Sequence, residues 1–248
     1  MLTGKALFNT LVTELNDMGL PGMSATLDEM YRSPDFVNLD PLMAIAALVE
    51  PEYLRKTNKR VQSRLRVAQL NGCPQELTNC VDSVDREYLP HGITNALSSL
   101  DFISTGMNVC ILGPSDSGKS YLAKALGIAA CNNYKVEYHH CAALLEQLVD
   151  FKTVDYTKYQ KRMKKLCRAA LLILDDFLLH TLSDEREVKV LFELMEKRSE
   201  INLSTIICSQ RDPASWTAMI MNDEVSANAI LKRATKHYTV MIKPKITK

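Results

Sequence analysis

Two glycines, a lysine and a serine stand at a chemically suggestive spacing in one short stretch, GPSDSGKS. The spacing matches the pattern GxxxxGK[ST], in which glycines let the backbone curl so that its N–H groups surround a phosphate. In such a loop the lysine reaches the β- and γ-phosphates, and the following hydroxyl binds Mg²⁺. We therefore predict an ATP-binding loop made of Gly113, Pro114, Ser115, Asp116, Ser117, Gly118, Lys119, Ser120 and Tyr121.

A pair of adjacent carboxylates supplies the metal partner that a phosphate loop needs. The segment ALLILDDFLL places Asp175 and Asp176 directly after an apolar run, where a buried strand would end beside the loop. In this Walker B arrangement Asp175 holds Mg²⁺, together with Ser120, and Asp176 orients or deprotonates the attacking water. The alternative interpretation is that the two acids only cap the next helix.

Another polar pair follows a later apolar run, in the segment STIICSQRDP. Ser209 and Gln210 are suited to sensing the γ-phosphate or holding the attacking water, although alone they would indicate only a turn.

These groups require a sheet that brings the ends of several strands together. Short apolar runs, each separated from the next by a segment of helical pattern, occur at 107–112, 136–140, 169–174, 203–208 and 237–242. Strands that alternate with helices predict an α/β fold with a five-stranded, mainly parallel sheet covered on both faces. Only about six residues follow the last run, so we expect no helical lid after the sheet.

The segment before this core reads as all-helical. Apolar residues recur at helical spacing up to Met18, a second helix is expected over 24–32, and a longer pattern from Pro41 is bent or divided at Pro51. We predict a small helical domain over 1–68 and an α/β core over 69–248.

Basic residues cluster near the end of the helical segment, with no acid between Tyr53 and Arg66. The cluster consists of Arg55, Lys56, Lys59, Arg60, Arg64 and Arg66. It favours contact with a nucleic-acid backbone, and a solvated helix face is the alternative. Basic stretches at 152–168 and 232–248 are further candidates. The net charge of the chain is only +1, so any such attraction must come from local clustering.

Composition indicates an ordinary globular protein. The chain has 248 residues, 46% of them hydrophobic, and seven scattered cysteines that fit reduced thiols better than a disulfide framework. No apolar stretch approaches the length needed to span a bilayer, so we expect a cytoplasmic protein without a membrane partner.

Taken together, these segments resemble the AAA+ ATPases of the IstB-like branch, helper proteins of insertion-sequence transposition that are similar to DnaC helicase loaders. The resemblance covers nearly the whole chain. It is carried by EPEYLRKTNKRVQSRLRVAQL, FISTGMNVCILGPSDSGKSYLAKALG, LLILDDF, LSDEREVKVLFELMEKRSEINLSTIICSQRDPASW and AILKRATKHYTVMI. It implies a P-loop ATPase core behind a helical domain, with ATP and Mg²⁺ bound. It also implies a homo-oligomer, as a ring or helical filament on double-stranded DNA, that assists a transposase.

The resemblance further assigns roles to single residues. Lys119 and Ser120 match the Walker A positions, Asp175 and Asp176 match Walker B, Gln210 matches the sensor, and Arg233 matches the arginine finger that completes a neighbouring subunit's site. Three positions depart from the family pattern. Asp116 replaces a small residue, Gln210 replaces a shorter polar side chain, and Lys232 stands where an acid is common. These departures concern the rate of hydrolysis more than the fold.

Other functions remain open for the same residues. A DnaC-like loader would use its N-terminal helices to grip a replicative helicase and would favour single-stranded DNA. A nucleotide or small-molecule kinase would be monomeric and indifferent to DNA. A nucleotide-dependent scaffold with negligible hydrolysis would be consistent with a repulsive carboxylate at Asp116.

Overall fold

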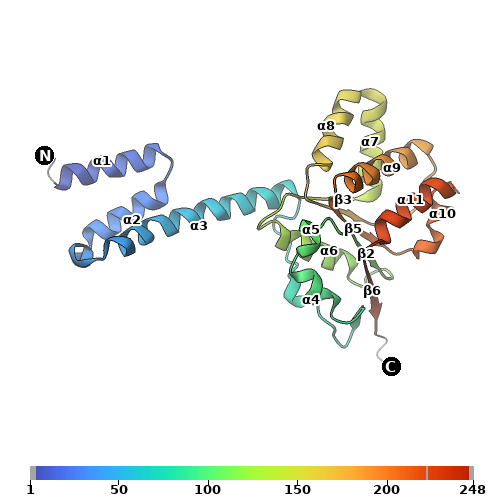
Figure 1. Ribbon diagram of the computed structural model, residues 1–248, viewed down its shortest axis with the longest axis horizontal. Helices are drawn as coiled ribbons and strands as arrows, with labels where there is room; N and C mark the ends of the chain where they lie inside the picture. Colours follow the sequence, from blue (N-terminus) through green and yellow to red (C-terminus); the bar gives the residue numbers. More distant parts are fainter. Residues whose placement is uncertain (1–3, 222, 246–248) are drawn as a thin grey trace. The chain divides into compact units, whose positions relative to one another are not determined.

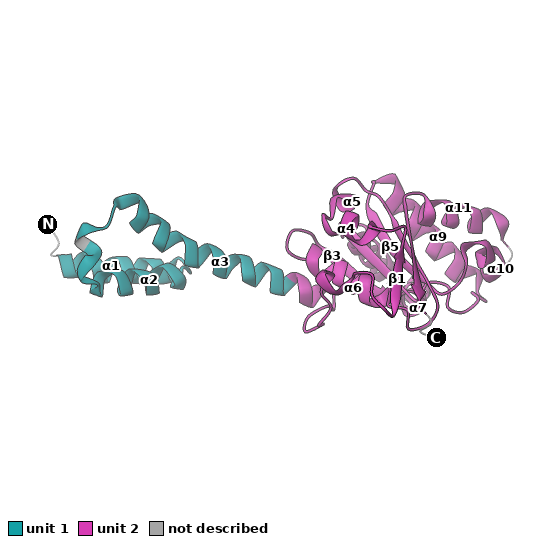
Figure 2. Ribbon diagram, turned by 90° about the horizontal axis from the view of Figure 1, so that it is seen from below, with its two compact units in different colours: residues 1–63 teal, residues 64–248 magenta. Residues whose placement is uncertain are grey.

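The structure is a computed structural model that describes residues 4–221 and 223–245. The chain divides into two compact units, residues 1–63 and 64–248 (Figure 2). The division falls inside helix α3 (Pro41–Val67), whereas the sequence analysis places the domain boundary just after the end of that helix.

Unit 1 is helical, with α1 (Gly4–Asp17), α2 (Pro21–Arg32), the 3₁₀ helix η1 (Pro34–Asn38) and the first part of α3. Proline begins three of these elements, where its missing N–H costs nothing and its fixed φ favours a helix. Asp40 caps α3 by accepting hydrogen bonds from the amides of Leu42 and Met43. The helix is not divided at Pro51, because the flanking turns keep their own hydrogen bonds when one is lost.

Unit 2 is built on one six-stranded sheet (Figure 1). Its strands lie in the order β1 (Arg86–Leu89), β6 (Tyr238–Pro244), β2 (Val109–Leu112), β5 (Ser204–Ser209), β4 (Leu171–Asp175) and β3 (Val136–His140). The last five are parallel to one another, which confirms the predicted fold class and the strands expected from the apolar runs.

Strand β1 is the addition that sequence analysis missed. It pairs antiparallel with β6 and forms from REYL, a four-residue segment that lies outside the apolar runs from which the strands were predicted. Edge strands need few apolar residues because only part of their surface is covered, so this one leaves little trace in the hydrophobic pattern.

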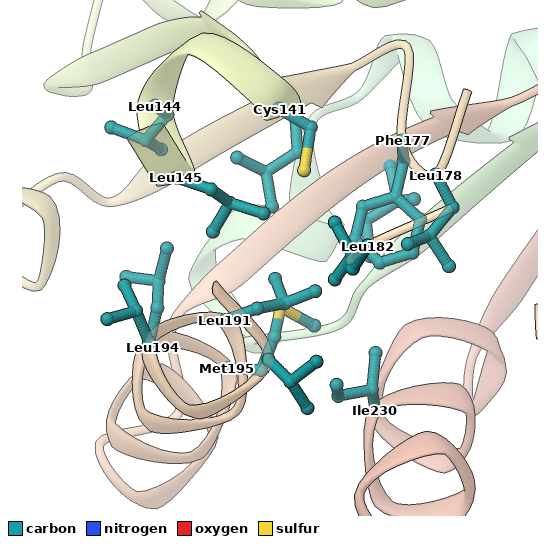
Figure 3. Close-up of a cluster of buried hydrophobic side chains, with 14 of the residues drawn as sticks. Cys141, Leu144, Leu145, Phe177, Leu178, Leu182, Leu191, Leu194, Met195 and Ile230 are labelled. Atoms are coloured by element: carbon teal, nitrogen blue, oxygen red, sulfur yellow. The ribbon is translucent and has the colours of Figure 1, made fainter. Parts of the chain in front are cut away.

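Helices cover both faces of the sheet. Neighbouring residues of one strand enter different cores: Val109 and Ile111 face one cluster, while Cys110 and Leu112 face the other. The first cluster packs under α4 (Ile93–Ser98), α5 (Asp101–Ser104) and α6 (Lys119–Ala130). The second packs under α7 (Cys141–Val154), α8 (Tyr156–Leu166), α9 (Glu185–Glu200), α10 (Trp216–Met219) and α11 (Glu224–Thr235). Figure 3 shows its centre, where side chains of α7, α9 and α11 meet those that follow β4.

Within residues 4–221 and 223–245, no helix combines the length and hydropathy needed to cross a membrane. In the same part of the chain, β6 is the last element, and no lid helix follows it.

Candidate nucleotide site

The carboxyl edge of the sheet gathers the groups that the sequence singled out. Strand β2 ends at Leu112, the loop 113–118 follows, and α6 begins at Lys119. Strands β4 and β5 end at the same edge, at Asp175 and Ser209. Ligands of open α/β sheets bind outside the carboxyl ends of the strands, so the topology alone marks this edge as a binding site.

The loop backbone has a shape that requires its two glycines. Gly118 has φ +102°, which side-chain-bearing residues rarely adopt. A Cβ on Gly113 would lie 2.6 Å from the carbonyl oxygen of Ile242 and 2.7 Å from Oγ of Ser117. The Ser117 hydroxyl is buried and has no hydrogen-bond partner among the described residues. The loop ends where α6 begins, and the first amides of that helix are free to bind an anion.

Lys119 is held at the mouth of this loop. Its side chain is largely buried, and Nζ donates a hydrogen bond of 2.6 Å to the carbonyl oxygen of Pro114. Burial lowers the pKa of Lys119, and the nearby carboxylates, among them Asp175 and Asp116, oppose that shift. An added phosphate would satisfy the same ammonium group with a full negative charge.

Ser120 and Asp175 form the candidate metal site. Ser120 Oγ lies 3.0 Å from Asp175 Oδ1, and the Tyr138 hydroxyl donates to Oδ2 at 2.5 Å. Asp175 is only 1% exposed, and these two hydrogen bonds fix its orientation. Burial and the Asp175 carboxylate raise the pKa of Tyr138, so the phenol remains a donor. A hydroxyl and a carboxylate are hard oxygen ligands, a donor set that fits Mg²⁺.

Asp176 has different surroundings from its neighbour. It has φ +52°, and its side chain is 36% exposed. Its amide donates to Asp175 Oδ1 at 3.1 Å, and its carboxylate lies 3.2 Å from His140 Nδ1. The backbone turn therefore points the second carboxylate toward solvent while the first stays buried.

An open cleft of about 350 Å³ joins these groups. Its lining contains the loop residues Ser115, Asp116, Gly118, Lys119, Ser120 and Tyr121, together with Asp176, Gln210 and Arg86. The structure thus brings the predicted catalytic Asp176 and Gln210 to the phosphate loop. Asp116 is exposed at φ +58°, and Ser115 Oγ lies 3.4 Å from its carboxylate. The Tyr121 hydroxyl points to the 3₁₀ helix η2 (Leu77–Asn79), where the Glu76 amide and Asn79 side chain donate to it.

Three residues of this site carried no signal in the sequence analysis: Tyr138, His140 and Arg86. The apolar run at 136–140 was interpreted there only as a strand of the sheet. The partners of Tyr138 and His140 are Asp175 and Asp176, which strand pairing brings close across β3 and β4. The register of these two strands could have revealed them.

Arg233 lies far from the cleft of its own chain. Its backbone carbonyl accepts a hydrogen bond from Asn108, which directly precedes β2, so this residue lies at the amino edge of the sheet. Its guanidinium lies 5.4 Å from the centre of the Phe192 ring and 3.4 Å from Glu196 on α9. The phosphate loop is at the opposite edge.

The six basic residues of α3 divide into two groups. Arg55 is pinned within unit 1, where it donates to Glu52 at 3.1 Å and to the carbonyl oxygen of Gly19 at 3.1 Å. Arg64, within unit 2, donates to the carbonyl oxygens of Cys131 and Asn132, which directly follow α6. Both arginines therefore have structural tasks. The other four side chains are exposed: Lys56, Lys59, Arg60 and Arg66.

Comparison with known proteins agrees with this geometry. The family model described as "IstB-like ATP binding protein" matches residues 13–245. The insertion sequence ATP-binding protein y4uH of Sinorhizobium fredii is 34% identical over 220 residues, covering 88% of this chain and 86% of that protein. A second protein of that organism, y4pL, is 32% identical over 221 residues, covering 89% of this chain and 87% of its own.

Solved structures share the fold at lower identity. The crystal structure of the DnaC helicase loader has a TM-score of 0.53 and 18% identity, covering 69% of this chain and 98% of its own. The AMPPCP-bound DnaA of Aquifex aeolicus has a TM-score of 0.56 and 18% identity, covering 69% of this chain and 51% of its own. The core therefore has the fold of the AAA+ P-loop proteins.

Proposed function

Because the chain belongs to the family of IstB-like ATP binding proteins, we propose that it is an ATPase that assembles on double-stranded DNA and assists a transposase in target selection. The observation that carries the ATPase is the meeting of Lys119, Ser120, Asp175 and Asp176 at one edge of the sheet. The transposition context is supported by the relatives, which are named as insertion sequence proteins.

In the proposed reaction, residues of this chain hold the phosphates and activate water. Lys119 and the amides at the start of α6 bind the terminal phosphates. The Asp176 carboxylate accepts a proton from water, whose oxygen attacks the γ-phosphorus while the bond to the β,γ-bridging oxygen breaks. The products are ADP and inorganic phosphate. Gln210, at the same cleft, orients the water. Mg²⁺ bound by Ser120 and Asp175 would supply positive charge to the phosphate oxygens.

Assembly is part of this proposal because one chain alone does not complete the site. Arg233 lies at the amino edge of its own sheet and so cannot serve its own loop. An arginine supplied by a neighbour would stabilise the transferring phosphoryl group, an effect worth roughly 10³–10⁵ in rate in related systems. ATP bound between subunits would then favour the assembled form.

The DNA contact that we propose in unit 1 uses Lys56, Lys59 and Arg60. Their spacing of three and four residues places them on one face of α3, and all three are exposed. Lys56 has only a distant carboxylate neighbour, Glu52 at 3.9 Å, and the described residues give Lys59 and Arg60 no ion pair. Such a face neutralises backbone phosphates without reading bases, so affinity should fall steeply with salt and vary little with sequence.

The test is nucleotide-dependent DNA binding, measured by fluorescence anisotropy on duplex and single-stranded probes, with ATP, a non-hydrolysable analogue or ADP. We expect tight duplex binding only with a triphosphate, and assemblies visible by negative-stain electron microscopy. Lys119→Ala, which removes the ammonium, should lose both.

A preference for single strands together with capture of a replicative helicase would favour the loader function instead. A protein that stays monomeric with saturating ATP and plasmid would contradict the proposal.

A further inference from the structure

Strand β1 carries a cation to the phosphate loop. Because β1 runs antiparallel to β6, its first residue, Arg86, lies at the carboxyl edge of the sheet. The last residue of β2, Leu112, pairs with Met241 of β6. Arg86 pairs with Pro244, which lies three positions further along β6. The strand therefore extends past the end of β2 to the level of the loop.

The Arg86 side chain reaches over the last glycine of that loop. One guanidinium nitrogen lies 2.5 Å from the position that a Cβ on Gly118 would occupy. Gly118 directly precedes α6, where the free amides of the helix begin. Arg86 also lines the cleft that contains Lys119 and Ser120. Its charge therefore lies beside the anion-binding end of the helix.

The guanidinium has no anion of its own among the described residues. No carboxylate in that part of the chain lies within 4.0 Å of it. The nearby Cys80 thiol is buried, which raises its pKa to about 11, and burial also raises the pKa of Tyr88. Both groups stay neutral near pH 7 and do not balance the arginine. An unpaired guanidinium facing a phosphate cleft is suited to bind a phosphate oxygen.

The order of the strands decides which phosphate it faces. Asp175 ends β4, Asp176 follows it, and Gln210 follows β5, so the groups proposed to act on the γ-phosphate lie on one side of β2. Strands β6 and β1 lie on the other side. Arg86 therefore approaches the loop from the end opposite the catalytic carboxylates.

We propose that Arg86 is a nucleotide-affinity residue that binds the α-phosphate, and so holds ATP and ADP equally. This inference rests on the proposed ATP site. Arg86 is then the second cation of the cleft, beside Lys119. Its positive charge offsets the carboxylates of Asp116 and Asp176, which also line the cleft. A group bound to the α-phosphate contributes the same interaction before and after hydrolysis, so it sets affinity without favouring either nucleotide.

The test is isothermal titration calorimetry of wild type, Arg86→Ala and Arg86→Lys with ATP, ADP and adenosine. Because Arg86→Ala removes a charge-assisted hydrogen bond, it should weaken the binding of ATP and of ADP by the same factor, about 10- to 100-fold. Arg86→Lys should recover part of this loss, and adenosine binding should not change. Lys243→Ala, which removes an exposed cation from the neighbouring strand, should bind both nucleotides as wild type does.

Two controls separate the possible failures. Thermal unfolding without nucleotide should give the same midpoint for Arg86→Ala and wild type. If Arg86→Lys binds like Arg86→Ala while both are unstable, the residue is structural and the proposal is overturned.

If Arg86→Ala lost more affinity for ATP than for ADP, or lost affinity for neither nucleotide, the proposed role of Arg86 would also be overturned. If wild type and Lys119→Ala bind nucleotide equally, the proposed ATP site itself is wrong. Loss in Lys119→Ala with no change in Arg86→Ala contradicts only the role of Arg86.

Discussion

Two identical side chains at adjacent positions acquire different properties because their surroundings differ. Asp175 is buried and bonded to Ser120 and Tyr138, which leaves its oxygens fixed for a cation. Asp176 follows at positive φ, is part-exposed, and touches His140. A carboxylate with a fixed orientation is suited to bind a metal ion, whereas a carboxylate that is open to the cleft can accept a proton from water.

This division predicts the behaviour of Asp176→Asn. The amide cannot take a proton, so hydrolysis should fall about 10²- to 10⁴-fold, while ATP affinity stays within roughly threefold of wild type. Phosphate release and calorimetric affinity are the measurements. Asp175→Asn is the matched control and should instead lose the Mg²⁺ dependence of binding. Normal turnover in Asp176→Asn would show that another group activates the water.

The exposed carboxylate of Asp116 opposes the charge that its loop binds. Asp116→Asn should therefore tighten ATP binding, roughly two- to tenfold at low salt, since screening by solvent keeps the repulsion modest. Asparagine is the suitable replacement because it tolerates φ +58° as aspartate does. Titrations at two salt concentrations test this, and the gain should shrink at high salt. An affinity unaffected by both salt and substitution would show that Asp116 does not oppose the bound nucleotide.

At the level of elements, strand β3 is joined to α8 by a buried charge. Glu137 is almost fully buried and lies 3.2 Å from Arg162 and 2.8 Å from Lys165, both on α8, and 2.9 Å from His139. Burial alone would raise the pKa of this carboxyl, but the three partners together lower it to about 2. The same strand ends at His140, beside Asp176.

Acid should therefore weaken the attachment of β3 to α8. The folded pKa of Glu137 is about 2, against 4.5 ordinarily, so its stabilising contribution is complete above pH 4.5 and is lost as pH falls toward 2. Its size is about 2–3 kcal/mol. Urea unfolding of Glu137→Gln and wild type should differ by that amount near pH 7 and converge near pH 2. A difference that does not vary with pH would contradict the assignment.

At the level of the whole molecule, the sheet separates the groups that we propose to act on one phosphate. The loop and both aspartates lie at its carboxyl edge, and Arg233 lies at its amino edge, packed on Phe192. In the assembly that we propose, a single copy therefore contributes its loop and carboxylates to one site and its Arg233 to the site of a neighbouring copy. We expect hydrolysis to rise more steeply than linearly with protein concentration.

Mixing two inactive variants tests this arrangement. The Arg233→Ala subunit keeps an intact phosphate loop, and the Lys119→Ala subunit keeps the arginine. An interface between the two variants can therefore restore one complete site. Mixing at equal amounts should recover turnover up to roughly one quarter of the wild-type value, the fraction of complete sites when neighbours are drawn independently. Either variant alone should stay near background. No recovery at any mixing ratio would show that Arg233 does not act between subunits.

Local spacing and periodicity were enough to predict the phosphate loop, the paired aspartates and the five parallel strands. A loop pattern depends on residues next to one another, and a strand buried on both faces must be an apolar run. The short edge strand β1 meets neither condition, because it contains no motif and only two of its four residues are apolar.

The tasks of single arginines depended instead on partners distant in the sequence. Arg64 looks like its basic neighbours, yet folding brings it to the end of α6, where unsatisfied carbonyls require donors. Strand order and strand direction likewise place Arg86 and Arg233 at opposite edges of the sheet.

The sequence by itself determined which phosphate chemistry this chain contains, because that chemistry lies in contiguous residues. Only the tertiary structure decided which cations face the cleft and which are used elsewhere, because that depends on pairings between segments far apart in the chain.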